Sequence, residues 1–259
     1  MIHAGDLVNR AESDREWGEW FRAGGWVHAV MPGIPVPGNH EYSGGDLSGH
    51  WRCQFALPTE GPAGLEETVY HVDYQGVRVI ALNSNKMVAE QRVWLDSALA
   101  HNAQRWTFVT FHHPVFSSAK GRDNKDVRRH WKPLLDQYRV DLVLQGHDHI
   151  YARGRNLPVG VSGRDPESGT MYVVSVSGPK MYGLTAERWM DRGAENTQLF
   201  QVISVDADTV RYQALTATGE LYDAFDLIKR EGATNQLVER TPPDRPERTF
   251  ESKLREWPY

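Results

Sequence analysis

Four apolar segments of this chain each run directly into a short polar loop, and this recurrence limits the fold more than any other feature. The loops combine glycine, proline, asparagine, aspartate and histidine, and they lie at residues 5–6, 38–41, 112–114 and 146–149. Segments with helical spacing separate several of the apolar ones, so strands and helices alternate along this part of the chain. Such alternation is typical of a layered α/β fold, in which loops at strand ends hold ligands.

The expected elements divide into an alternating part and an all-strand part. In the alternating part, strands are expected at 2–4, 34–36, 69–74, 77–82, 106–111 and 141–144, and helices at 14–24, 90–99 and 127–138. Gln75 and Gly76 predict a tight hairpin between two of these strands. Further strands are expected at 171–176, 199–205, 210–217 and 220–228. We assign these four to the far sheet of a four-layer α/β/β/α sandwich.

Length and composition favour one catalytic domain at 1–229 followed by a polar tail at 230–259. A chain of 259 residues with 40% hydrophobic residues can bury a sizeable core. The tail is polar and contains proline, which predicts a peripheral segment that is disordered or held against the surface.

Charge and cysteine content exclude several classes of partner and site. The formal net charge is −5 and no long run of Lys or Arg occurs, so no nucleic-acid polymer is expected as a partner. Cys53 is the only cysteine, which excludes an internal disulfide and a zinc site built from several cysteines. The apolar runs are too short for a membrane-spanning helix, so no membrane segment is expected.

Taken singly, each polar loop also has an ordinary explanation. In an extended loop, His147 and His149 leave on the same side while Asp148 points away, although an isolated His-x-His is equally compatible with a solvated polar turn. The Gly-Asn-His-Glu loop at 38–41 is compatible with an ordinary turn, and Asp6 with a cap for the helix that follows. The hypothesis of a metal site therefore depends on the four loops as a set.

In this order the four loops resemble the metal-binding motifs of the calcineurin-like metallophosphoesterases, most closely the branch related to purple acid phosphatases. The resemblance extends to about residue 185. It implies an acid-phosphatase type of hydrolase that acts on small phosphomonoesters or phosphodiesters. Two metal ions, from among Fe, Mn and Zn, would activate the hydroxide that attacks phosphorus in line.

The resemblance also implies roles for individual residues. Asp6 would bridge the two metal ions, and His149 would bind the first. The second ion would be bound by Asn39, His112 and His147. His40 would lie beside the scissile phosphate, where it protonates the leaving oxygen or holds the phosphoryl oxygens.

Two further residues are candidates for substrate binding. His113 follows the expected ligand and would orient substrate, or it would only be exposed. Arg122 would contact phosphate, because a guanidinium pairs with phosphate oxygens through two hydrogen bonds. A solvated loop arginine is an equally good explanation.

Two departures from the family pattern alter these expectations. Asn9 occupies the position of a tyrosine ligand, so bound iron should not give the purple colour. The family's first motif belongs on a strand before Gly5, so we expect the chain to be truncated there and to lack that strand. An impaired relative that only binds metal or phosphate is therefore the alternative function. Exported relatives suggest an extracytoplasmic location for the full-length protein.

Overall fold

The structure is a computed structural model that describes residues 1–155 and 169–249. The chain folds as two compact units that interleave along the sequence. The first unit consists of Met1–Val115, Lys125–Leu134 and Leu144–His147. The second consists of Phe116–Asn124, Leu135–Val143 and the described residues from Asp148 onward.

The first unit begins with strand β1 (Ile2–His3), which pairs in parallel with β2 (Ile34–Pro35). Helices α1 (Asp14–Gly24) and α2 (Trp26–Val30) connect the two strands, and α1 confirms the helix expected at 14–24. The hydroxyl of Ser13 accepts a hydrogen bond from the Glu16 N–H at 3.3 Å and caps α1. Asp6 is therefore not the helix cap, which removes one ordinary explanation of that residue.

Short elements follow β2 and close this part of the first unit. They are the 3-10 helix η1 (Asn39–Glu41), β3 (Tyr42–Ser43), β4 (Asp46–Leu47) and α3 (Gly49–Gln54). Trp17 of α1 and Trp51 of α3 are both completely buried and belong to one apolar cluster with Val8. This cluster anchors the residues that follow β1 against those that follow β2.

The predicted hairpin is confirmed in β5 (Tyr70–Tyr74) and β6 (Val77–Ala81). Gln75 and Gly76 have φ angles of 47° and 82°, the left-handed pair that a tight type I′ hairpin turn requires. Strand β6 also pairs in parallel with β7 (Trp106–Phe111). Helix α4 (Gln91–Ala100) provides the crossover that a parallel pair needs.

The single helix expected at 127–138 is wrong, because two short helices occupy this region. They are α5 (Lys125–His130) and α6 (Lys132–Gln137). Pro133 accounts for the interruption, since it has no N–H to donate to the preceding turn and stands in the first turn of α6, where proline is tolerated. Strand β8 (Leu142–Gln145) follows and leads into the loop that begins at Gly146.

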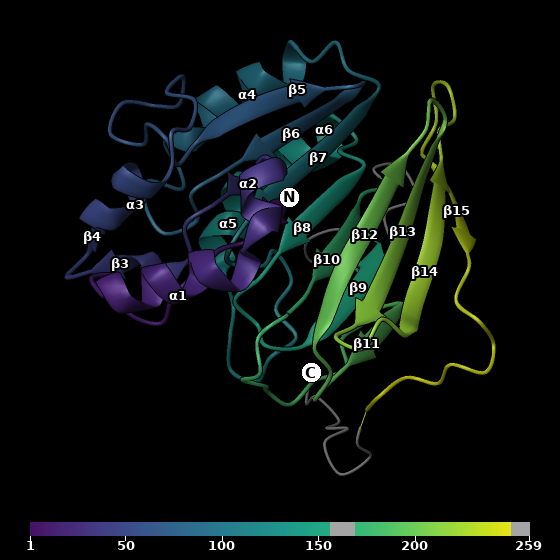
Figure 1. Cartoon of the computed structure of the whole chain (residues 1–259). Helices are drawn as coiled ribbons and strands as arrows, with labels where there is room; N and C mark the ends of the chain where they lie inside the picture. Colours follow the sequence, from purple (N-terminus) through teal and green to yellow (C-terminus); the bar gives the residue numbers. More distant parts are fainter. Residues whose placement is uncertain (156–168, 250–259) are drawn as a thin grey trace. The chain divides into compact units, whose positions relative to one another are not determined.

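The second unit contains strands in two groups (Figure 1). Strand β9 (Tyr151–Arg155) pairs with both β10 (Met171–Val174) and β11 (Arg192–Ala194). The other group is an antiparallel sheet of β12 (Leu199–Val205), β13 (Thr209–Thr216), β14 (Leu221–Ile228) and β15 (Gln236–Glu239).

The assignment of 171–176 to the same sheet as the later strands was wrong. Strand β10 pairs with β9 instead, and all four of its side chains are buried. Along β12 and β13 buried side chains alternate with more exposed ones, as expected for a sheet with one covered face. A fully buried run therefore distinguishes β10 from β12 and β13.

Part of the expected tail also forms a strand. Strand β15 lies within 230–259 and pairs with β14 from Phe225 to Ile228. Residues 250–259 of the expected tail lie outside the described residues. The mixture of helices and strands confirms the α/β class. Helices within the described ranges lack the length and apolarity that crossing a membrane requires.

A buried ion-pair network ties β9 to β14 and β15 inside the second unit. Arg153 is 2% exposed and donates to both carboxylate oxygens of Asp223, at 2.8 and 3.0 Å. It also donates to Glu239 at 2.7 Å. The Tyr151 hydroxyl donates to Asp223 at 2.6 Å. Burial raises the pKa of Asp223, but its hydrogen bonds and charge interaction with Arg153 outweigh burial and lower it overall.

We predict that Asp223→Ala lowers the free energy of unfolding by about 3 to 5 kcal/mol, because Arg153 would remain as a buried charge without its main partner. Urea unfolding of the chain measures this change. Arg211→Ala is the control, since Arg211 forms an ion pair with Asp206 that is largely exposed. That variant should lose about 1 kcal/mol or less. Equal losses in the two variants would contradict the structural role of the buried network.

Candidate metal centre

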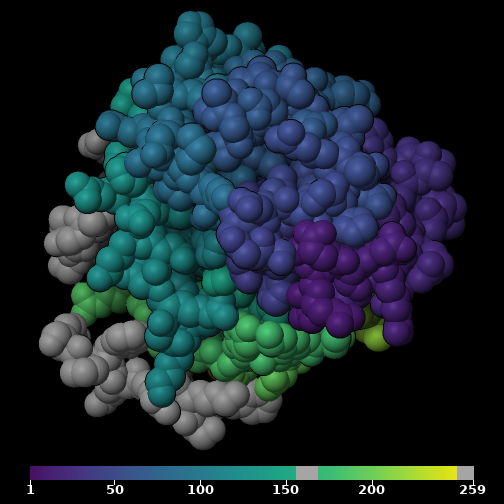
Figure 2. Space-filling model, turned by 90° about the vertical axis from the view of Figure 1, so that its left-hand side faces the viewer, coloured from purple at the N-terminus to yellow at the C-terminus, as the bar shows by residue number. Residues whose placement is uncertain are grey.

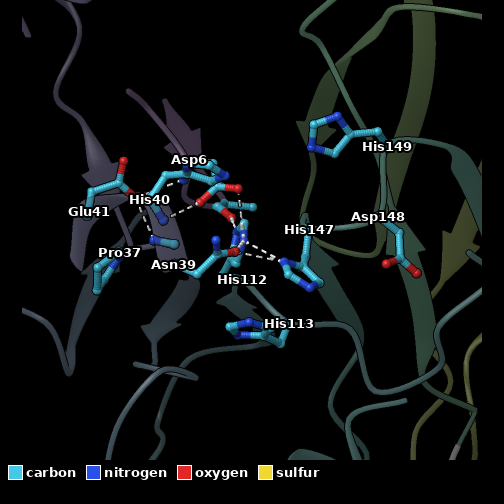
Figure 3. Close-up of polar contacts among 12 residues, drawn as sticks. Asp6, Pro37, Asn39, His40, Glu41, His112, His113, His147, Asp148 and His149 are labelled. Carbon is cyan, nitrogen blue, oxygen red and sulfur yellow. Dashed lines mark hydrogen bonds and ion pairs between the residues drawn. The ribbon is translucent and has the colours of Figure 1, made fainter. Parts of the chain in front are cut away.

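Four side chains from four different loops converge in the first unit (Figure 3). Asp6 follows β1, Asn39 begins η1 after β2, His112 follows β7, and His147 follows β8. The Nε2 atom of His112 lies 3.2 Å from Asp6 Oδ2 and 3.1 Å from Asn39 Oδ1. The Nδ1 atom of His147 lies 2.9 Å from Asn39 Oδ1 and 3.0 Å from His112 Nε2. The structure thus brings together four of the five predicted metal ligands.

The hydrogen bonding of His112 determines which atom it presents to this cluster. Its Nδ1 lies 2.8 Å from the carbonyl oxygen of Ala4, which can only accept, so Nδ1 carries a proton. In the neutral ring Nε2 then holds a lone pair, directed at the oxygens of Asp6 and Asn39. A carbonyl that orients a histidine in this way is typical of metal ligands. Acceptor atoms this close need a proton or a cation between them, so the residues fit a metal ion.

Glycines allow the loops to approach this closely. A Cβ atom at Gly5 would lie 2.6 Å from the Gly38 backbone nitrogen and 2.7 Å from His112 Nδ1. A Cβ atom at Gly146 would lie 2.8 Å from the Ala4 carbonyl oxygen. These three distances are all shorter than non-bonded atoms allow, so a side chain at either glycine would push the loops apart. The glycines of the motifs are therefore required by packing around the ligands.

Two of the candidate ligands have strained backbone conformations. Asp6 has a φ angle of 56° and His147 one of 65°, in the left-handed region that residues other than glycine rarely adopt. The His40 N–H donates to Asp6 Oδ1 at 3.0 Å, and the Gly146 N–H donates to the His112 carbonyl at 3.0 Å. Strain of this kind persists where the surroundings fix the conformation, and it concentrates at functional sites.

The charge of Asp6 suits a metal ligand. Burial raises its pKa, but a hydrogen bond and charge interaction with His112 in its protonated form, together with the His40 N–H and charge, outweigh burial and lower the pKa to about 2. Asp6 is therefore an anion throughout the neutral range. A set of one carboxylate, one amide oxygen and imidazoles suits Fe, Mn or Zn.

His113 belongs to the same cluster. One ring nitrogen of each of His112, His113 and His147 lies within 4.8 Å of the others. The Ser84 hydroxyl oxygen lies 2.9 Å from His113 Nδ1 and also accepts from the His113 N–H at 2.9 Å. Ser84 therefore fixes the orientation of this ring. The predicted role of His113 in orienting substrate stays a prediction.

His40 lies beside an open groove of about 730 Å³. Residues 9–13 form one part of its lining, and Asn39, His40, Tyr42 and Ser43 form the other. The purple and blue segments of Figure 2, which include these residues, lie side by side at the surface. His40 Nδ1 lies 2.7 Å from the Asn9 carbonyl oxygen, which holds the ring in place.

His149 and Arg122 belong to the second unit, where each has its own contacts. His149 Nδ1 lies 2.8 Å from the Lys180 carbonyl, and its ring stacks on Tyr182. Since a carbonyl only accepts, the proton is on Nδ1 and the neutral ring carries its lone pair on Nε2. Arg122 contacts Tyr182 at 3.3 Å and Asp148 at 3.6 Å, so it is not simply a solvated loop arginine. The metal role of His149 and the phosphate role of Arg122 stay predictions.

Several supporting groups of the centre were not predicted from the sequence. Glu41 lies in the Gly-Asn-His-Glu loop at 38–41, but the sequence predicted no function for it. Its carboxylate is fully buried and accepts a hydrogen bond from the Asp6 N–H. The backbone carbonyls of Ala4 and Asn9 orient two histidines, and Ser84 orients a third. Only the glutamate had a sequence signal, because it directly follows two residues with predicted functions.

Comparison with known proteins extends these observations. Residues 1–151 match the family described as calcineurin-like phosphoesterase. An uncharacterized protein of Mycobacterium tuberculosis is 33% identical over 179 residues, which cover 59% of this chain and 34% of that protein. Purple acid phosphatase 13 of Arabidopsis thaliana is 28% identical over 153 residues, which cover 54% of this chain and 28% of that protein.

Among solved structures, the chain is similar to purple acid phosphatase PPD1 from yellow lupin (Lupinus luteus) seeds. The TM-score is 0.74 at 20% sequence identity, and the match covers 89% of this chain and 46% of that chain. This similarity confirms the metallophosphoesterase fold expected from the sequence. The chain spans about a third of the length of the two curated relatives described above.

We predict that His147→Ala and Asn39→Ala weaken binding of Zn²⁺ to the chain, since each removes an atom from the convergent set. The loss should be at least the 10- to 100-fold typical of removing a supporting residue from a metal site. Competition with a chromogenic chelator measures the affinity, and circular dichroism verifies folding. His101→Ala is the matched control, because His101 is exposed at the end of α4. Unchanged affinity in both variants would contradict this ligand set.

Proposed function

Because the chain belongs to the calcineurin-like phosphoesterase family, we propose that it hydrolyses small phosphate esters at a centre that holds two metal ions. Asp6 would bridge the two ions and His149 would bind the first. The second ion would be held by Asn39, His112 and His147. Fe, Mn and Zn all suit these ligands.

The observation that carries this proposal is the convergence of acceptor atoms in the first unit. Four side-chain atoms of Asp6, Asn39, His112 and His147 lie within 2.9 to 3.2 Å of a neighbour in the set. When bound, metal ions in such a centre activate a water molecule and stabilise negative charge on phosphate oxygens. The residues around them must then bind the ester and supply the proton that the leaving group needs.

His40 is suited to that proton transfer. Its Nδ1 proton is held by the Asn9 carbonyl, so any proton that it exchanges with substrate is on Nε2. As a general acid, His40 must therefore act as the imidazolium. Since His40 lines the groove together with residues 9–13, Tyr42 and Ser43, we propose that the leaving group lies in this groove.

Two further residues complete the proposed substrate site. His113, fixed by Ser84, would orient the ester beside the metal centre. Arg122 would contact the phosphate oxygens in exchange for its present contacts with Asp148 and Tyr182. Both roles concern binding, so loss of either side chain should raise KM more than it lowers kcat.

A panel of nitrophenyl esters tests the proposal. The chain is assayed with nitrophenyl phosphate, bis-nitrophenyl phosphate and nitrophenyl acetate, with Zn²⁺ or Mn²⁺ and with a chelator. We expect hydrolysis of at least one phosphate ester, its loss on chelation and its recovery on adding metal, with little hydrolysis of the acetate. Metal binding without turnover of either phosphate would favour the alternative, a relative that only binds metal or phosphate.

We predict that His40→Ala lowers the rate on phenyl phosphate by about 10² to 10⁴, the usual contribution of a general acid. Metal content should stay unchanged, because His40 acts on the ester. The loss should be smaller for dinitrophenyl phosphate, whose acidic leaving group needs little protonation. Steady-state rates on the two esters and metal analysis of the purified variant measure these effects.

Equal losses on phenyl and dinitrophenyl phosphate would contradict the role as leaving-group acid and leave only a role in binding phosphate oxygens. His101→Ala is again the control, and it should retain the rate on both esters.

A further inference from the structure

Glu41 is a fully buried carboxylate whose bonds join two loops of the metal centre. Its Oε2 accepts from the N–H groups of Asp6 at 2.8 Å and Gly38 at 2.6 Å. Its Oε1 accepts from the N–H groups of Leu7 at 2.7 Å and Val8 at 3.2 Å. Each carboxylate oxygen therefore receives two backbone donors. Three of the four come from the loop after β1.

This arrangement requires an ionised carboxylate. Successive N–H groups that point into one concavity form an anion site, and here the anion is a side chain of the same chain. A proton on either oxygen of Glu41 would face two N–H donors, so the neutral acid does not fit this geometry. Glutamine has the same size but replaces one acceptor oxygen with an NH2 group. The hydrogens of this group would likewise face two backbone N–H donors.

The bonds to Glu41 act directly on Asp6. The Asp6 backbone is left-handed at a φ angle of 56°, and its N–H is bound by Glu41. With the backbone fixed, Asp6 Oδ1 accepts from the His40 N–H at 3.0 Å, while Oδ2 faces His112 at 3.2 Å. Loss of the carboxylate would release the N–H groups that define the loop. The orientation of the Asp6 carboxylate would then no longer be fixed.

We propose that Glu41 is a positioning residue that sets the Asp6 loop against the Asn39–His40 loop and so determines the metal affinity of the centre. This inference rests on the metal centre of the proposed function. A purely structural carboxylate would stabilise the fold without changing how tightly folded molecules bind metal. Metal affinity, measured on folded protein, separates the two roles.

The test compares Glu41→Gln with Glu16→Gln in the whole chain. Glu16 is a matched control because it also accepts backbone N–H groups, those of Asn9 at 2.9 Å and Arg10 at 2.7 Å, which follow the Asp6–Val8 segment that Glu41 holds. Zn²⁺ affinity is measured by chelator competition, and thermal unfolding by circular dichroism identifies a temperature at which each variant is folded. We expect Glu41→Gln to bind Zn²⁺ about 10- to 100-fold more weakly. Glu16→Gln should bind it as the unmodified chain does.

Glu41→Asp is the second variant, and it decides the matter if Glu41→Gln does not fold. Aspartate keeps the charge but is one methylene shorter, so it should hold some of the N–H groups and lose less affinity than glutamine. Unchanged Zn²⁺ affinity in a folded variant, with only a lower unfolding temperature, would overturn the positioning role. A larger loss for aspartate than for glutamine would overturn it too, because glutamine keeps the size of glutamate without its charge, and the loss would then follow packing volume rather than the carboxylate charge.

Failure of the positioning role of Glu41 can be distinguished from failure of the proposed phosphate-ester hydrolysis. If the unmodified chain binds Zn²⁺ but hydrolyses no phosphate ester, the proposed hydrolysis fails while the Glu41 comparison still stands on affinity. If the unmodified chain binds no Zn²⁺, the metal centre fails and the role of Glu41 fails with it.

Discussion

Acceptor atoms repel one another at hydrogen-bond distance unless a proton or a cation lies between them, and this constraint governs the first unit. Asp6, Asn39, His112 and His147 each place such an atom 2.9 to 3.2 Å from at least one neighbour in the set. A fold built only for stability would place donors opposite acceptors. The chain instead places glycine in the loops and adopts left-handed backbone at two of the ligands. Glycine and left-handed backbone both lower the stability of the fold, and binding of a cation by the cluster explains why they occur here.

Two carboxylates close to this cluster have opposite surroundings and therefore different tasks. Asp6 faces imidazoles and a backbone N–H, which lower its pKa to about 2 against the effect of burial. Burial and the nearby Asp6 charge raise the pKa of Glu41, while its four backbone N–H bonds favour the ionised form. Asp6 is directed at the cation site and Glu41 at the backbone. The first can bind metal, and the second can hold the first in place.

Backbone carbonyls fix the orientation of two of the imidazoles. Ala4 fixes the proton of His112 on Nδ1, and Asn9 does the same for His40. In both rings Nε2 is therefore the atom available for chemistry: His112 directs it at the cluster, and in the proposed function His40 uses it to protonate the leaving group. The chemical difference between a ligand and an acid thus depends on where each ring points. No motif singles out Ala4, and Asn9 stands out in the sequence only because it occupies the position of the tyrosine ligand.

The sequence by itself determined the α/β class and the hairpin at Gln75 and Gly76, because periodicity and turn chemistry are local properties of the chain. It predicted the candidate ligands through the resemblance of its loops to family motifs. Only the tertiary structure decided that β10 pairs with β9 and that Glu41 holds the Asp6 loop. These outcomes depend on contacts between segments far apart in the chain. Burial and the direction of a hydrogen bond arise only when such segments meet, so no local pattern could specify them.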